Sequence, residues 1–293
     1  MRNAAPAAVR PLPRLPGGAL IRQPVATLAA AVLGAILAAA LVAPLIAGAD
    51  PTALNPVSRL RPPSAEFPLG TDHLGRDLWS RLVYGARVSL LVGIAVAALS
   101  VAVGLAIGLV SGYVRWLDAV VMRIMDGLMA IPGILLAIAL VSVSGASLLT
   151  VIVAIAVPEI PRVVRVVRAV VLTVREEPYV EAAVAAGTPL GAILRRHVLP
   201  NCVPPLIVQA TYVCASAMLT EAILSFLGAG TPPTIPSWGN MVAEARLLFP
   251  VVPRNLLWPG AALALTILAV NLLGDALRDR LDPRLAKRIG GSR

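Results

Sequence analysis

Long runs of uncharged residues constrain this chain more than any other feature. Five stretches contain no Asp, Glu, Lys or Arg, and they cover residues 24–49, 88–114, 127–158, 198–220 and 255–274. A hydrocarbon core about 30 Å thick requires about 20 apolar residues per helix, so each stretch is long enough to cross a bilayer. The composition agrees, because 58% of the residues are hydrophobic and only 14% are charged. We therefore predict an all-α integral membrane protein.

The longest uncharged stretch predicts two helices. A single helix over residues 127–158 would be about 48 Å long, and the turn-like sequence of residues 142–147 interrupts it. The two helices then take their outer turns from charged flanks. We expect six transmembrane helices, at approximately residues 25–48, 88–112, 119–142, 148–167, 204–227 and 256–277.

The distribution of basic residues predicts the orientation. Most of the 25 Lys and Arg residues fall in or beside segments that are cytoplasmic if both termini lie inside, as the positive-inside rule requires. This topology makes residues 1–24 and 284–293 cytoplasmic tails. It also explains the net charge of +10 without a nucleic-acid partner. Because the apolar run of residues 25–48 exceeds that of a signal peptide, we expect the first helix to be retained.

The polar segment 49–87 should lie outside. In its second part, Asp72 and Arg76, and then Asp77 and Arg81, stand four residues apart. This spacing predicts an interfacial amphipathic helix over Leu74–Arg87, and the alternative is a connector that runs directly into the second span. Within that span, Gly104, Gly108 and Gly112 repeat every four residues, which predicts close helix packing along one face.

The inner segment 168–203 has the most specific pattern. Acidic residues and Pro178 precede a short apolar run that ends at Gly187, which are start and stop signals of a helix. Thr188-Pro189 then opens a second short helix that continues to Leu199-Pro200. The pattern predicts a helical hairpin with little surface to bury against itself. It gains stability either by docking on a cytoplasmic partner or by lying on the lipid surface, and the residues alone leave both open.

A family resemblance favours the first alternative. The spacing of Glu181-Ala182-Ala183, Gly187 and Leu199-Pro200 resembles the EAA loop of permease subunits of bacterial ATP-binding-cassette importers. His197 stands where the general pattern has Ile, which is similar to the peptide-permease branch. Residues 65–285 resemble the C-type subunit of dipeptide, oligopeptide and nickel permeases in several segments, among them Phe67–Asp72, Ser80–Leu90, Leu224–Gly228, Pro236–Met241 and Asn271–Asp275.

The resemblance implies a type I importer permease fold with a five-helix core over residues 88–283. It implies that the hairpin is a coupling helix seated on a separate ATPase subunit, through Glu181, Ala182, Ala183, Gly187, Leu199 and Pro200. The implied partners are a second homologous permease, two ATPases that carry ATP and Mg²⁺, and an extracytoplasmic substrate-binding protein, at a bacterial cytoplasmic membrane. The chain's only lysine, Lys287, is not part of a phosphate-binding loop, so we expect no nucleotide or other cofactor on this chain.

No catalytic or metal site is expected. The two histidines, His73 and His197, should lie on opposite sides of the bilayer, and no hydrolase or metalloprotease motif is present. Among charged groups near the spans, we expect Asp126 to pair with Arg123 and Glu159 to pair with Arg162. The outer Pro-rich loop suggests a contact of Trp238 and Asn240 with the binding protein.

Glu221 and Ser225 are candidates for the substrate pathway, because an ionisable group within a span is a functional hypothesis by default. Glu221 either meets a cationic substrate amine or pairs with a polar group between subunits. The resemblance implies import of dipeptides or oligopeptides, with nickel or metal chelates as the alternative. A stand-alone secondary transporter would be expected to show internal repeats, and none is visible.

Overall fold

The computed structural model describes residues 24–281, and this range contains helices and loops without a β-strand. The expected tails, residues 1–24 and 284–293, lie outside it except for Pro24. The helices are α1 (Pro24–Leu41), α2 (Ala43–Ile46), α3 (Leu78–Tyr113), α4 (Arg115–Ala130), α5 (Gly133–Ser144), α6 (Leu148–Val174), α7 (Pro178–Ala185), α8 (Leu190–Ile193), α9 (Leu199–Phe226), α10 (Trp238–Ala245) and α11 (Arg254–Leu281).

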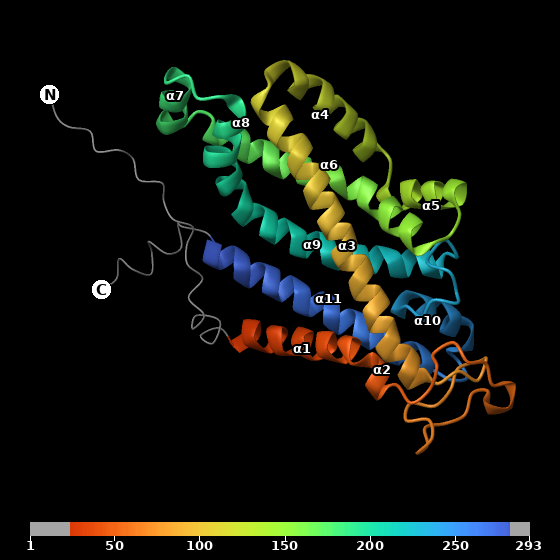
Figure 1. Cartoon of the computed structure of the whole chain (residues 1–293). Coiled ribbons are helices and arrows are strands. Elements are labelled where there is room, and N and C mark those ends of the chain that lie inside the picture. The colour runs from red at the N-terminus through yellow and green to blue at the C-terminus, as the bar shows by residue number, and fades with distance from the viewer. Residues whose placement is uncertain (1–23, 282–293) are drawn as a thin grey trace.

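The long helices form an elongated bundle (Figure 1). The helices α7 and α8 lie at the same end of the bundle as the start of α1 and the end of α11, whereas α10 and the loop before α3 lie at the opposite end. The first described turn of α1, the last described turn of α11 and the inner hairpin therefore lie at one end of the bundle.

Four helical segments in the described range are long and apolar enough to cross a membrane: α1, α3, the helix from Leu190 to Phe226, and α11. They correspond to the predicted first, second, fifth and sixth spans. The predicted third span is a pair of helices, α4 and α5, that meet at an angle of 88° and would make a fifth crossing if counted together. The predicted fourth span coincides with α6 but is not in this apolar class.

The bend between α4 and α5 follows from Pro132. The ring of a proline disfavours helical backbone at the preceding residue, and Ile131 accordingly adopts an extended conformation with ψ 128°. Pro132 directly precedes α5, and Gly145 with φ +83° follows its last residue, Ser144. Ser147 caps the following helix by accepting a hydrogen bond from the Thr150 amide, so the turn-like sequence does separate two helices as predicted.

The expected interfacial helix over Leu74–Arg87 is not a separate element. Instead, α3 begins at Leu78 and continues without a break to Tyr113, which matches the alternative of a connector. Asp77 decides the start point, because its carboxylate accepts hydrogen bonds from the amide groups of Trp79 and Ser80. A capping carboxylate of this kind satisfies amides that have no partner within the helix.

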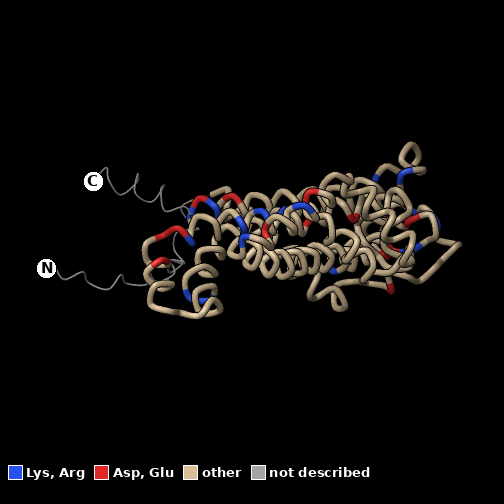
Figure 2. The backbone as a smooth tube through the Cα atoms, turned by 90° about the horizontal axis from the view of Figure 1, so that it is seen from above, with Lys and Arg blue, Asp and Glu red and all other residues tan. Residues whose placement is uncertain are grey.

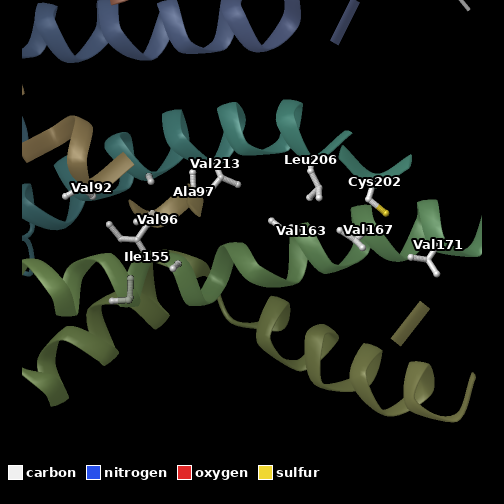
Figure 3. Packing of buried hydrophobic residues seen from close by; sticks show 14 of the residues in the cluster. Val92, Val96, Ala97, Ile155, Val163, Val167, Val171, Cys202, Leu206 and Val213 are labelled. Carbon is white, nitrogen blue, oxygen red and sulfur yellow. The ribbon is translucent and has the colours of Figure 1, made fainter. Parts of the chain in front are cut away.

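The glycine stripe of α3 packs against valines of α6, as the spacing predicted. A Cβ atom added to Gly104 or Gly108 would lie 2.6 Å from Cβ of Val163 or 2.7 Å from Cβ of Val167. Gly112 meets Val171 in the same way. These valines belong to the larger apolar core, formed mainly by α3, α6 and α9 (Figure 3).

A second core joins α9 to α1, α3, α10 and α11 through Leu78, Leu90, Met218, Trp238 and Leu263. The helix α9 therefore contributes to both cores. It connects the end of the bundle that carries the hairpin with the end that carries α10.

Candidate functional sites

The inner hairpin has the predicted first arm. Glu177 precedes α7, and Pro178 occupies its first turn, where the missing amide hydrogen costs nothing. Val180 is the one buried residue of α7, and Glu181 and Ala182 are exposed. Ala183 is half-buried and contributes to the edge of the larger core. The exposed residues of α7 are thus mostly small, and they include the carboxylate of Glu181 and the larger side chains of Tyr179 and Val184.

Gly187 ends this arm in a left-handed conformation with φ +76°. The Gly187 amide donates to the Val184 carbonyl at 2.9 Å, and the Thr188 amide donates to the Ala183 carbonyl at 3.0 Å. These two bonds form a Schellman motif, which glycine favours because it lacks a Cβ atom. No atom would lie within 4 Å of a Cβ at Gly187, so backbone conformation rather than space demands glycine here.

The second arm differs from the prediction. The helix α8 is short and continues through a π-helical turn, Leu194–Val198, directly into α9. Leu199 and Pro200 are therefore the first residues of α9, not the end of a separate helix, and both are half-buried. Pro200 lies just after the π-helical turn. The hairpin is joined to α9 by continuous helical backbone from Leu190 onward.

Glu221 is enclosed at the other end of α9. Its side chain is fully buried, and its Oε1 accepts hydrogen bonds from Ser225 at 3.0 Å, Thr231 at 3.3 Å and Ser237 at 2.9 Å. Its Oε2 has no hydrogen-bond partner among the described residues and faces Gly239, where an added Cβ would lie 2.7 Å away. In this structure the hydrogen-bond partners of Glu221 belong to the same chain, whereas the predicted alternative to substrate contact placed a polar partner between subunits.

The other outer candidates are also internal. Trp238 is 2% exposed, and its indole Nε1 donates to the Leu82 carbonyl at 2.9 Å. Asn240 is 5% exposed and donates to several groups of the loop before it, among them the Thr231 carbonyl at 3.1 Å. Ser225 is buried as well. In this structure, these side chains hold the loop after α9 in place and are not available for direct contact with a binding protein or a substrate.

A buried ionic cluster that sequence reasoning missed joins α3 to α10. Arg81 is 2% exposed, and its Nη1 donates to Asp72 at 2.6 Å and to Glu244 at 2.7 Å. Arg76 pairs with the same two carboxylates. The expected partner of Arg81, Asp77, instead caps α3. No signal in the sequence links Glu244 to residues more than 160 positions earlier, because this contact requires the folded loop.

The two arginines control the ionisation of Asp72. Burial raises the pKa of the Asp72 carboxyl group, but the charges of Arg81 and Arg76 and the hydrogen bonds from Arg76 outweigh burial and hold its pKa below the usual range of an aspartate. Asp72, His73 and Glu244 offer ligand atoms within 4.8 Å of one another. A metal ion there would compete with two guanidinium groups, so the arrangement favours an ion-pair cluster.

The second half of α6 carries four charged residues between Glu159 and Arg168, and Figure 2 shows that charges are not confined to the two ends of the bundle. Glu159 pairs with Arg162 as predicted, at 2.8 Å. Asp126 does not pair with Arg123, since its partner is Arg165 at 2.6 Å. The helices α4 and α6 run side by side, so a residue on α6 reaches Asp126 more readily than one on its own helix.

Comparisons with known proteins agree with this arrangement. Residues 100–287 match the family model described as "Binding-protein-dependent transport system inner membrane component". The chain is 52% identical over 267 residues to a probable peptide ABC transporter permease protein of Sinorhizobium fredii, covering 91% of each chain. It is 46% identical to a putative peptide transport system permease protein of Brucella suis, covering 83% of this chain and 82% of the relative.

A third relative is the dipeptide transport system permease protein DppC of Alkalihalophilus pseudofirmus, which is 41% identical over 243 residues, or 83% of this chain and 80% of the relative. The family match covers more than half of the chain, and these relatives align over most of their own length. The chain therefore belongs to the binding-protein-dependent transport system inner membrane components, the permease subunits of ABC importers.

Proposed function

We propose that this protein forms part of the translocation path of a peptide importer and couples to ATPase subunits through the hairpin of α7 and Gly187. The relatives are named as peptide or dipeptide permeases, which supports peptides as the substrate class. The observation that carries the coupling role is the exposed face of α7, which lies at one end of the bundle with a glycine-specific turn behind it.

The importer needs further chains. We propose a second homologous permease, two ATPases that bind ATP and Mg²⁺, and an extracytoplasmic binding protein that delivers the peptide. Six crossings with both termini in the cytoplasm fit the chain if α4 with α5 forms the third and α6 the fourth. The resulting location is the bacterial cytoplasmic membrane.

The helical continuity of α8, the π-helical turn and α9 supports a mechanism. Binding of ATP by the ATPases favours one conformation of the assembly. A seated α7 would transmit that movement to α9 through continuous backbone, and α9 belongs to both apolar cores. Rotation of α9 against α3 and α6 would then change access to the path from one side to the other.

The test is a pair of glycine substitutions in the hairpin. In Gly187→Val the left-handed conformation costs about 1 to 3 kcal/mol, which disrupts the turn of an eight-residue helix. We expect normal membrane insertion, loss of peptide uptake and loss of peptide-stimulated ATP hydrolysis by the assembled importer. Gly191→Ala is the matched control, because Gly191 is helical and a Cβ there meets no atom within 4 Å. Full uptake by Gly187→Val, or equal losses in both variants, would contradict the proposed coupling.

A further inference from the structure

The pair formed by Glu159 and Arg162 lies deep within α6. At a rise of 1.5 Å per residue, Glu159 is about 17 Å and Arg162 about 21 Å along the helix from Leu148. A hydrocarbon core is about 30 Å thick, so both groups fall within the depth of the membrane. Charged side chains at such depth face a bundle interior or a water-filled path, because lipid cannot solvate them.

The two residues differ in exposure. The side chain of Glu159 is 8% exposed, whereas that of Arg162 is 46% exposed. Glu159 also accepts a hydrogen bond from Ser216 of α9 at 3.4 Å, which ties its carboxylate to the bundle. Glu159 therefore holds the guanidinium group of Arg162 from the packed side of α6, and the rest of that group lies on the exposed face of the helix.

Two nitrogen atoms of the Arg162 guanidinium group have no hydrogen-bond partner among the described residues. Only its Nη1 is engaged, with the two carboxylate oxygens of Glu159 at 2.8 and 3.0 Å. Its Nε and Nη2 make no hydrogen bond to any described residue. These two nitrogens form a planar fork that matches the two oxygens of a carboxylate.

We propose that Arg162, held by Glu159, binds the C-terminal carboxylate of the peptide during its passage through the membrane. This inference rests on the proposed peptide transport and names the part of the substrate that the chain recognises. Arg165 has the same exposed fraction, 46%, but lies about one turn closer to the inner surface and pairs with Asp126 of α4. It therefore provides a matched control on the same helix.

The test compares uptake of labelled trialanine with uptake of its C-terminal amide by cells that contain the complete importer. For each peptide, uptake by the variant is divided by uptake by the wild type. Because both importers use the same binding protein, its preference for one peptide does not affect this ratio. In Arg162→Gln we expect at least about a tenfold loss of uptake of the acid, the effect of one lost charged hydrogen-bond pair. Uptake of the amide should stay at the wild-type rate. Arg165→Gln should leave the ratio of acid to amide unchanged.

Two further variants separate recognition from folding. Arg162→Lys keeps the charge but loses the fork, and we expect an intermediate acid-to-amide ratio. The double variant Glu159→Gln with Arg162→Gln leaves no unpaired charge, so it should assemble normally and still lose its preference for the acid. Equal losses for acid and amide, or loss of the second permease on purification, would show a structural role and overturn the inference. If the wild-type importer transports neither peptide, the proposed peptide transport is wrong, and the inference that rests on it is wrong too.

Discussion

The contact between the glycine stripe of α3 and α6 allows a quantitative prediction for Gly108→Ala. The added methyl group would lie 2.7 Å from Cβ and 2.9 Å from Cγ1 of Val167, whereas carbon atoms normally approach to about 3.5 to 4.0 Å. The two helices must therefore separate by roughly 1 Å or shift. Overpacking of this kind costs about 1 to 3 kcal/mol, against a gain of about 1 kcal/mol from the helix propensity of alanine.

The difference in stability between Gly108→Ala and the control Gly260→Ala gives the steric cost of the added methyl group. Gly260 lies in α11, and a Cβ there has no atom within 4 Å, so this variant shows the gain in propensity alone. We expect the solubilised Gly108→Ala protein to melt about 3 to 10 °C below Gly260→Ala, measured at one heating rate. Equal melting temperatures for the two alanine variants would refute the close approach of α3 and α6.

Three further predictions concern the outer end of the bundle and are measured as melting temperatures of the solubilised protein. Asp77→Ala removes the cap of α3 and should cost about 1 kcal/mol, whereas Asp77→Asn should retain most of the stability. Because the pKa of Asp72 is lowered in the folded protein, its stabilisation is present above the ordinary pKa of an aspartate and is lost as the pH falls through the lowered folded pKa; Asp72→Asn should reduce this acid dependence. Glu221→Ala removes the acceptor shared by three buried hydroxyl groups and should destabilise the fold by about 1 to 3 kcal/mol or more, whereas Glu221→Gln should be milder because an amide oxygen can replace Oε1. A variant of Glu221→Ala that melts like the wild type would contradict the buried hydrogen-bond cluster.

Features that depend on neighbouring residues were predictable from the sequence. The lengths of the uncharged stretches identified the long helices, since the bilayer sets a minimum number of apolar residues. The positions of Pro178 and Gly187 identified the first arm of the hairpin, because both residues act on their own backbone. The four-residue repeat of Gly104, Gly108 and Gly112 identified a packing face for the same local reason.

Side-chain partners that are distant in the chain were decided by tertiary structure. Asp126 pairs with Arg165 of α6 rather than with Arg123, and Arg81 pairs with Glu244, because helix packing places these groups together. Spacing along one helix cannot show whether a neighbouring helix offers a better partner. The burial of Glu221 has the same origin, since the loop after α9 folds back over it. Local sequence signals thus located the helices and the hairpin turn, whereas helix packing set which charged side chains are enclosed and which, such as Arg162, remain exposed.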